Sequence, residues 1–255
     1  MRFLIHGAAG RMGVQVIDAV VKSGHTVAAA VDTAFADKQE YNDTHTEYPR
    51  YASLGECTVQ ADCIIDFSNH VCTIPLLDYA CAHKIPVMLA TTGQTEEEKQ
   101  AITDAAKQIP IFRAANMSLG IATLCSLVRT AVCMFPDADI EIVEKHHNQK
   151  LDVPSGTALA LAEVVRSVRE NANFVIGRHE NGKRKPEDVG IHSLRLGNVV
   201  GEHEVIITTG NETITLKHEA HSRAVFADGA VLAAAFLAGQ PIGLYTMENL
   251  VAACR

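Results

Sequence analysis

Hydrophobic positions in the first 113 residues follow two alternating spacings. Short runs rich in β-branched residues predict buried strands, and several of the stretches between them have the apolar spacing of a helix. Parallel neighbouring strands need crossover connections, which helices supply. We therefore expect a doubly wound α/β domain whose parallel sheet is covered on both faces. The predicted strands are residues 3–6, 26–31, 63–66, 86–90 and 109–112, and the predicted helices are residues 14–21, 74–82 and 96–107.

The pattern changes after Asn116. The remaining chain predicts helices at residues 119–134 and 157–169 and strands at residues 140–144, 191–196, 202–209 and 212–219. The last two strands alternate apolar and polar positions and are joined by Gly210-Asn211, which is typical of a hairpin. We therefore expect a first domain at residues 1–117 and a second, mixed α+β domain at residues 118–226. A helical tail at residues 227–255 is expected to return to the first domain.

The composition indicates a folded, soluble chain. Its 255 residues with 47% apolar content are enough for two domains with buried cores. The longest apolar stretch, residues 230–238, is far shorter than the roughly 20 residues of a membrane span, and the first residues lack the apolar core of a signal peptide. Seven cysteines without a C-x-x-C pair fit a reducing compartment. We therefore expect a cytoplasmic protein that does not bind membranes.

The first chemical motif is GAAGRMG at residues 7–13, directly after the first predicted strand. Glycines here allow a tight turn and let the backbone approach a pyrophosphate, which binds N–H groups at a helix N-terminus. The spacing is G-x-x-G-x-x-G. The commoner G-x-G-x-x-G fails, because Ala9 and Met12 occupy its second and third glycine positions. The alternative is that Gly7 and Gly10 only shape a turn.

Asp32 supports a dinucleotide-binding, Rossmann-like interpretation, because it ends the second predicted strand 25 residues after Gly7. An acidic side chain at this place accepts hydrogen bonds from the adenosine ribose and disfavours a 2′-phosphate. No arginine follows it, so the sequence favours NADH, while Lys38 leaves NADPH open. In the alternative interpretation Asp32 only caps the turn.

Two later segments follow further strands of the predicted sheet. They are LATTG at residues 89–93 and AANMS at residues 114–118. Ligands of open α/β sheets bind at the C-terminal ends of the strands, so both segments are candidates for cofactor contact. The alternative is ordinary turn chemistry, with Asn116 or Ser118 capping a helix.

The densest polar segment is EKHHNQKLDVPSGT at residues 144–157. The net charge of −8 disfavours nucleic-acid binding, so an acidic substrate needs a local basic cluster such as this one. His146 and His147 point in different directions if the strand continues, so one imidazole can donate a proton while its neighbour holds substrate. Lys150 adds a fixed positive charge.

Ser155, Gly156 and Thr157 precede an apolar helical run, so their hydroxyls and N–H groups form an anion site at a helix terminus. The alternative is that Ser155 or Thr157 is an N-cap and the histidines are solvated loop residues. We predict no metal, because adjacent histidines rarely chelate one ion together and no third ligand has a customary spacing. The residues alone therefore predict a small anionic acceptor of hydride.

The chain resembles the 4-hydroxy-tetrahydrodipicolinate (dihydrodipicolinate) reductases of bacterial diaminopimelate and lysine biosynthesis, over nearly its whole length. The most specific motif is E-x-H-H-x-x-K-x-D-x-P-S-G-T at residues 144–157. The resemblance also rests on G-x-x-G-R-M-G, IDFS at residues 65–68, TTG at 91–93, AANMS at 114–118, GIHS at 190–193 and GEH at 201–203.

This resemblance implies a role for each matching residue. His146 would be the acid/base residue, assisted by Lys150. The carboxylates of a cyclic dicarboxylate substrate would be held by His147, Ser155, Gly156 and Thr157, with Arg195 a weaker candidate. NADH, NADPH or both would bind a set of residues in the first domain, with Phe67 a candidate neighbour of the nicotinamide. That set is Gly7, Ala8, Ala9, Gly10, Arg11, Met12, Asp32, Phe67, Ala90, Thr91, Thr92, Ala114, Ala115, Asn116 and Met117.

The implied reaction is hydride transfer to a carbon conjugated with the ring imine, proton donation by His146 to the neighbouring carbon, and loss of water. Family members are typically homotetramers assembled through the second domain. Two alternatives stay open. Another NAD(P)-dependent dehydrogenase of amino-acid metabolism would share the first domain, and a non-catalytic nucleotide-sensing protein would keep the glycine loop and Asp32 without an acid/base cluster.

Overall fold

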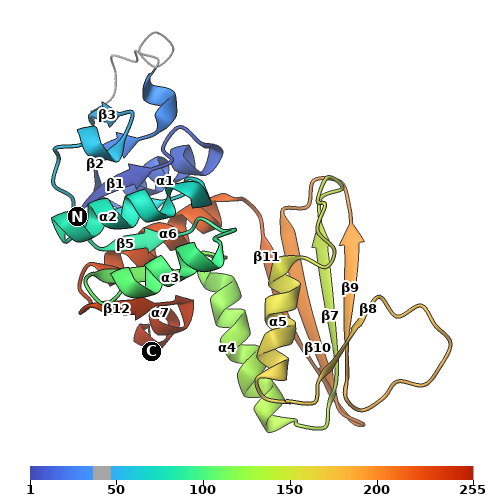
Figure 1. Cartoon of the computed structure of the whole chain (residues 1–255). Coiled ribbons are helices and arrows are strands. Elements are labelled where there is room, and N and C mark those ends of the chain that lie inside the picture. The colour runs from blue at the N-terminus through green and yellow to red at the C-terminus, as the bar shows by residue number, and fades with distance from the viewer. Residues whose placement is uncertain (37–46, 255) are drawn as a thin grey trace. The chain divides into compact units, whose positions relative to one another are not determined.

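A computed structural model describes residues 1–36 and 47–254, so Lys38 lies outside the described residues. The chain divides into two compact units. Unit 1 comprises Met1–Ser118 and Ala224–Arg255, and unit 2 comprises Leu119–Arg223. Each unit has its own sheet and its own hydrophobic core (Figure 1).

Unit 1 is built on a seven-stranded sheet in the order β12-β6-β5-β4-β1-β2-β3, with every neighbouring pair parallel. This confirms the expected doubly wound fold. The register sets His6 beside Asp66, Asp66 beside Leu89, and Leu89 beside Arg113, so the segments that follow these strands meet at one edge. The strands are β1 Arg2–His6, β2 Thr26–Val31, β3 Arg50–Tyr51, β4 Cys63–Asp66, β5 Val87–Leu89, β6 Pro110–Arg113 and β12 Gly243–Tyr245.

Helices cover both faces of this sheet (Figure 1). Helices α2 and α3 contribute Leu76, Leu77 and Ile102 to a core cluster with β1 and β4. Helix α6 packs on β4, β5 and β6 and against α1, which explains why apolar residues lie on almost all its sides. The helices are α1 Arg11–Lys22, α2 Thr73–His83, α3 Glu96–Ala105, α6 Ala224–Leu237 and α7 Met247–Ala253, with 3₁₀ turns at Thr33–Ala36, Leu54–Glu56 and His70–Cys72.

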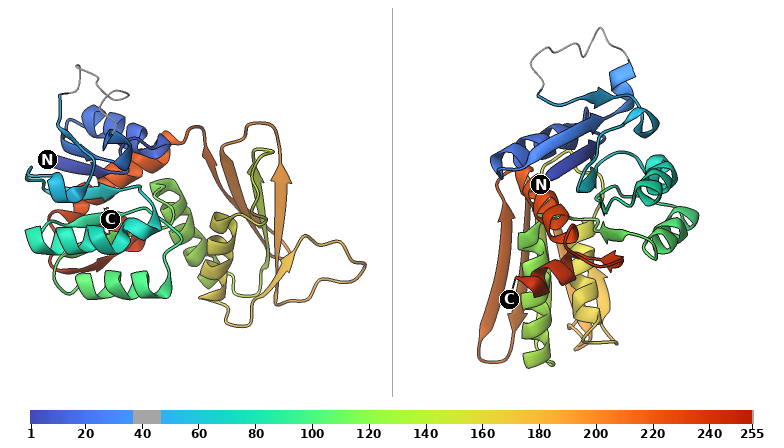
Figure 2. Two further views of the ribbon diagram at one scale, coloured as in Figure 1. Left: turned by 45° about the horizontal axis from the view of Figure 1, so that its top comes forward. Right: turned by 90° about the vertical axis from the view of Figure 1, so that its left-hand side faces the viewer.

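Unit 2 is a mixed five-stranded sheet in the order β11-β10-β7-β9-β8. Strand β10 is antiparallel to β7 and β11, and β9 is parallel to β7 and β8. Figures 1 and 2 show α4 and α5 side by side on one face of this sheet. The elements are α4 Leu119–Met134, β7 Asp139–His146, α5 Gly156–Arg166, β8 Asn173–Ile176, β9 Asp188–Arg195, β10 Gly201–Thr208 and β11 Thr213–Ala220.

Three short strands differ from the prediction. β3 and β8 were not predicted, and β12 lies within a tail predicted to be helical. Each lies at an edge of its sheet, where pairing with one neighbour orders it. A run of two to four residues carries too little periodicity to reveal that pairing in the sequence.

Candidate active site

The glycine loop joins β1 to α1 in unit 1. Gly7 has a φ of 79°, and a β-carbon there would lie 2.6 Å from the Phe67 carbonyl oxygen. A β-carbon on Gly13 would lie 2.2 Å from the Gly7 carbonyl oxygen. Both positions therefore require glycine. The N-cap of α1 is Gly10, which has no side chain to bind the first N–H groups of the helix, so the loop fits an anionic pyrophosphate.

Asp32 lies next to this loop, directly after β2. One carboxylate oxygen accepts from the backbone N–H of Ala9 at 3.0 Å, and the other accepts from that of Ala34 at 3.0 Å. A carboxylate oxygen has more than one lone pair, so these bonds leave acceptor capacity for a ribose hydroxyl. The structure thus brings the predicted acidic residue and the predicted glycine loop together.

A second carboxylate in unit 1, Asp66, was given no role by the sequence analysis. It ends β4, is 1% exposed, and accepts hydrogen bonds from His6 Nδ1 at 2.8 Å, Thr91 Oγ1 at 2.6 Å and Ser68 Oγ at 2.6 Å. These bonds join β1 and β4 to the segments after β4 and β5. The Thr91 loop and the Phe67 segment are therefore held at the same edge of the sheet.

A cavity of about 230 Å³ lies at this edge. It contains four of the predicted cofactor residues. Ala114 and Asn116 follow β6 at the same edge, and Asn116 Oδ1 accepts from the Ser118 N–H at 2.9 Å, as the turn interpretation expects. The lining residues are Phe67, Ser68, Asn69, His70, Ala90, Thr91 and Thr92.

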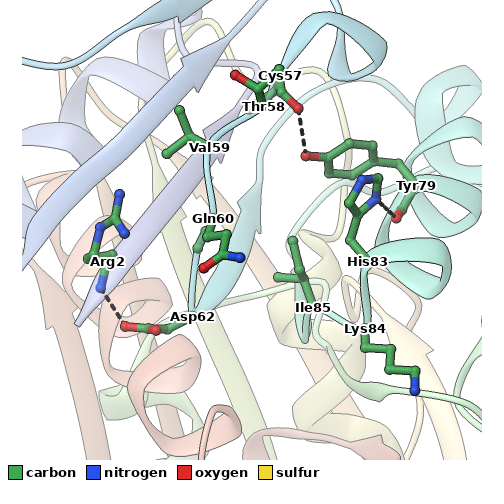
Figure 3. Close-up of a pocket in the computed structure, with 11 residues that line it drawn as sticks. Arg2, Cys57, Thr58, Val59, Gln60, Asp62, Tyr79, His83, Lys84 and Ile85 are labelled. Carbon is green, nitrogen blue, oxygen red and sulfur yellow. Dashed lines mark hydrogen bonds between the residues drawn. The ribbon is translucent and has the colours of Figure 1, made fainter.

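Another cavity of unit 1, of about 390 Å³, lies between the segment before β4 and the end of α2 (Figure 3). Arg2 and Asp62 line this cavity, so it lies at the edge of the sheet where β1 and β4 begin. Across it, Tyr79 donates a hydrogen bond to the Cys57 carbonyl oxygen at 3.3 Å. It contains none of the predicted site residues. Because ligands of parallel sheets bind at the opposite edge, we assign this cavity no role.

The acid/base candidate of unit 2 lies at the end of β7. Alternation along the strand turns Glu144 and His146 to the face covered by helices, where Glu144 is fully buried and His146 is 8% exposed. His146 Nδ1 lies 2.5 Å from Glu144 Oε2. The Glu144 oxygens also accept from Arg195 Nη1 at 2.9 Å, Arg195 Nη2 at 3.0 Å and the Ser155 N–H at 3.1 Å. Sequence reasoning gave Glu144 no role.

Burial and the hydrogen bond between the two side chains shift the pKa values of Glu144 and His146 in opposite directions. Burial raises the pKa of Glu144, but hydrogen bonds from Arg195 and His146 outweigh it and hold the pKa below its usual value. Burial lowers the pKa of His146, and the positive charges of Lys150 and Arg195 lower it further against the opposing effect of Glu144. Glu144 is therefore ionised and His146 is neutral at neutral pH.

Lys150 lies in the turn after β7, where its backbone N–H donates to the His147 carbonyl oxygen at 3.2 Å. Its Nζ pairs with Asp152 Oδ1 at 2.8 Å. The hydrogen bond from Lys150 lowers the pKa of Asp152, and a bond from the Gly156 N–H adds to the effect. The Asp152 carboxylate thus contacts Lys150, which the sequence analysis predicts to assist His146, and Gly156, which it predicts to hold a substrate carboxylate.

Ser155 is the N-cap of α5, as the alternative interpretation expects. Its Oγ accepts from the Ala158 N–H at 3.2 Å and lies 3.1 Å from His203 Nε2. Gly156 and Thr157 are the first two residues of the helix. His203 is 4% exposed, and its ring centre lies 5.1 Å from that of His146. Burial, followed by the nearby charge of His146, lowers the pKa of His203 to about 4.

The remaining predicted residue, Arg195, is held by protein groups. Its Nη2 also donates to the Asp152 carbonyl oxygen at 2.7 Å, in addition to the bonds with Glu144. The structure therefore gathers His146, Arg195 and the start of α5 around Glu144, and it places the charge of Lys150 near His146. Among residues 1–36 and 47–254, no three His, Cys, Asp or Glu side chains form a group able to hold a metal ion, and no helix is long and apolar enough to cross a membrane.

Comparison with known proteins covers almost the whole chain. Residues 1–117 match the family described as dihydrodipicolinate reductase, N-terminus, and residues 120–251 match dihydrodipicolinate reductase, C-terminus. The 4-hydroxy-tetrahydrodipicolinate reductase of Caldanaerobacter subterraneus subsp. tengcongensis is 48% identical over 255 residues, and that of Clostridium novyi is 39% identical over 253 residues. In both comparisons 98% of each chain is covered.

Solved structures agree with this result. A dipicolinate-bound dihydrodipicolinate reductase from Paenisporosarcina sp. TG-14 superposes with a TM-score of 0.83 at 25% identity, covering 98% of both chains. A myo-inositol dehydrogenase from Corynebacterium glutamicum, at 14% identity and a TM-score of 0.60 over 99% of this chain and 93% of the other, shares the fold alone. The chain belongs to the dihydrodipicolinate reductase family.

Proposed function

We propose that this chain reduces 4-hydroxy-tetrahydrodipicolinate to tetrahydrodipicolinate with NAD(P)H, with loss of water, in bacterial diaminopimelate and lysine biosynthesis. Full-length similarity to relatives of that name supports this function. The structural observation that carries it is the group around Glu144. A buried imidazole, His146, is bonded to an ionised carboxylate beside the positive charge of Lys150.

The cofactor's chemistry is hydride donation. The residues proposed to hold it are the glycine loop, Asp32 and the segments after β4, β5 and β6. The N-cap of α1 supports this, because Gly10 has no side chain that would compete with a phosphate for the first N–H groups of the helix. We propose NADH as the preferred cofactor, because a negative charge at Asp32 repels a 2′-phosphate.

The proposed substrate is a cyclic dicarboxylate, as the dipicolinate bound by the Paenisporosarcina relative suggests. His147, Lys150, Ser155, Gly156 and Thr157 would hold its carboxylates, with the start of α5 supplying N–H donors. Arg195 would act through Glu144, which its guanidinium already binds. A carboxylate arriving at Lys150 and Gly156 would have to exchange with Asp152.

His146 is the proposed proton donor to the carbon next to the one that receives hydride. Its pKa lies below the usual value in the free protein. A bound dianion next to the ring would raise that pKa, because a nearby negative charge favours the imidazolium. Substrate binding would therefore protonate the acid that the reaction uses, and Lys150 would stabilise negative charge that develops on the substrate.

We further propose a cytoplasmic homotetramer assembled through unit 2. Helices α4 and α5 cover one face of the five-stranded sheet, and no helix of unit 2 lies on the other face (Figure 2). Val143 and Ile206 on that uncovered face are half-buried. Light scattering of the purified protein tests the assembly. A monomer at micromolar concentration would overturn it.

The function is tested by following NADH and NADPH consumption with freshly generated 4-hydroxy-tetrahydrodipicolinate. The proposal expects turnover with formation of tetrahydrodipicolinate, at a higher kcat/KM for NADH. Folded protein that binds NADH without consuming it would instead indicate a nucleotide-sensing protein. Folded protein that oxidises NADH only with a different acceptor would indicate another dehydrogenase.

A further inference from the structure

Glu144 makes an unusually complete set of bonds for a buried carboxylate. It is fully buried in unit 2, and its oxygens accept from an imidazole, a guanidinium and a backbone N–H. Arg195 supplies two parallel N–H donors, the geometry of a strong ion pair. An ionised carboxylate has no proton to give, so every one of these groups must donate to it.

This fixes the positions of the protons on His146. Nδ1 lies 2.5 Å from Glu144 Oε2, so it carries a hydrogen whether the ring is neutral or charged. The proton that the ring gains and loses is therefore on Nε2. Building on the proposed function, we propose that Glu144 is the positioning residue that holds Nδ1–H and so presents Nε2 as the nitrogen that delivers the proton.

Gly201 supports this assignment from the neighbouring strand. A β-carbon on Gly201 would lie 3.1 Å from His146 Nε2 and 3.4 Å from His146 Cδ2. The backbone of Gly201 is not left-handed, so conformation does not oppose a side chain there, but the His146 imidazole would have to shift by a few tenths of an ångström to admit one. The absence of a side chain at Gly201 thus leaves space beside the nitrogen that the proposal makes the proton donor.

Glu144 also joins the imidazole to the proposed carboxylate clamp. It accepts from the N–H of Ser155, the N-cap of α5, and from Arg195, whose Nη2 also donates to the Asp152 carbonyl oxygen. One carboxylate therefore sets the ring of His146, the start of α5 and the loop at Asp152 relative to one another. A charge-assisted bond of this kind holds geometry more firmly than a neutral one.

The charged and titratable groups that face His146 come from several elements. Glu144 lies on the same strand, Arg195 on β9 and His203 on β10, while Lys150 lies in the following loop. Of these, Glu144 is the one that favours the imidazolium. Its removal should therefore lower the pKa of His146.

The decisive variant is Glu144→Gln, assayed for kcat and KM across pH, beside Glu141→Gln as its control. Glu141 is on the same strand and also accepts from a histidine and an arginine, His192 at 2.7 Å and Arg178 at 3.1 Å, but on the other face of the sheet. A positioned general acid contributes about 10²- to 10⁴-fold in rate, so we expect kcat of Glu144→Gln to fall by about 10- to 100-fold. KM should change much less.

The pH profile separates this role from a merely structural one. Losing an opposite charge in contact lowers a histidine pKa by about one unit or more, so the alkaline fall of kcat should move to lower pH by about that amount in Glu144→Gln. Glu141→Gln should keep the wild-type profile. An unshifted profile in Glu144→Gln, with kcat within twofold of wild type, would overturn the proposal.

In Glu144→Gln, Arg195 loses its buried ion-pair partner, which can prevent folding. Two further measurements test the proposal in that case. Nitrogen-15 NMR of His146 in the wild-type protein should show hydrogen on Nδ1 of the neutral ring, and hydrogen on Nε2 alone would contradict the proposal. Gly201→Ala should lower kcat by about three- to tenfold by displacing Nε2, and an unchanged kcat would contradict it. Wild-type turnover tests the proposed function separately.

Discussion

Two buried carboxylates, one in each unit, accept hydrogen bonds from histidine Nδ1 atoms, but their other partners differ. Asp66 in unit 1 accepts from the hydroxyls of Thr91 and Ser68 and from His6. Glu144 in unit 2 accepts from His146 and from Arg195. Hydroxyl donors fix loops without adding charge, whereas a guanidinium keeps a buried carboxylate ionised.

We infer from this difference that Asp66 supports cofactor binding and that Glu144 supports proton transfer. Asp66 holds the Thr91 loop and the Ser68 segment, which lie at the proposed cofactor edge of the sheet. Glu144 holds an imidazole among positive charges, which tune that ring as an acid. Changes around Asp66 should therefore alter cofactor affinity, and changes around Glu144 should alter turnover and its dependence on pH.

The largest effect is expected for His146→Ala. Loss of a general acid lowers rate by about 10²- to 10⁴-fold, so kcat should fall by that factor. NADH affinity, measured by fluorescence titration, should stay close to wild type, because the proposed cofactor residues are in unit 1. A variant that turns over at the wild-type rate would remove His146 from the mechanism.

His203 gives the next largest effect, on stability. The pKa of His203 is about 4 in the folded protein, below the roughly 6.5 of a free histidine. Between about pH 4 and pH 6.5 this side chain is therefore protonated in the unfolded chain and neutral in the folded protein. The free energy of unfolding should therefore fall as pH drops from 7 to 4.5, by about 2 to 3 kcal/mol from this residue. Urea unfolding at both pH values measures it. His203→Gln should flatten the dependence, and equal slopes in the two proteins would contradict the assignment.

Asp66→Asn tests the role of the unit 1 carboxylate in cofactor binding. Weakening charge-assisted bonds to Thr91 and Ser68 should raise the NADH dissociation constant by about tenfold, while kcat at saturating NADH and its pH profile stay near wild type. Asp62→Asn is the control, since Asp62 accepts from the Arg2 N–H at 2.7 Å at the opposite edge of the sheet. A shifted pH profile of kcat in Asp66→Asn would contradict the different roles assigned to Asp66 and Glu144.

The smallest effect is expected for Asp152→Asn. The Asp152 carboxylate pairs with Lys150 and receives a bond from the Gly156 N–H, so it competes with a substrate carboxylate for both. Its side chain is 57% exposed, and an exposed pair contributes less than about 1 kcal/mol. KM for the dicarboxylate should therefore fall by about two- to fourfold, at unchanged NADH affinity. A higher KM would indicate that Asp152 supports the site instead.

The sequence predicted most of the fold and the chemistry of residues 144–157, because hydrophobic period and motif spacing are local properties. It missed the two carboxylates that organise the candidate sites. Thr91 lies 25 residues from Asp66, and Arg195 lies 51 residues from Glu144, so only the sheet registers bring the partners together. It also missed β12, whose pairing with β6 depends on a distant part of the chain.

The most direct test of the account uses NADH deuterated at its transferable C4 position, with freshly generated 4-hydroxy-tetrahydrodipicolinate and the wild-type protein. Mass spectrometry of the product should find one cofactor-derived deuterium in each tetrahydrodipicolinate formed. His146→Ala should form this labelled product slowly, while binding NADH normally. Folded wild-type protein that leaves NADH unoxidised, or that oxidises it without label reaching the product, would contradict the proposed function.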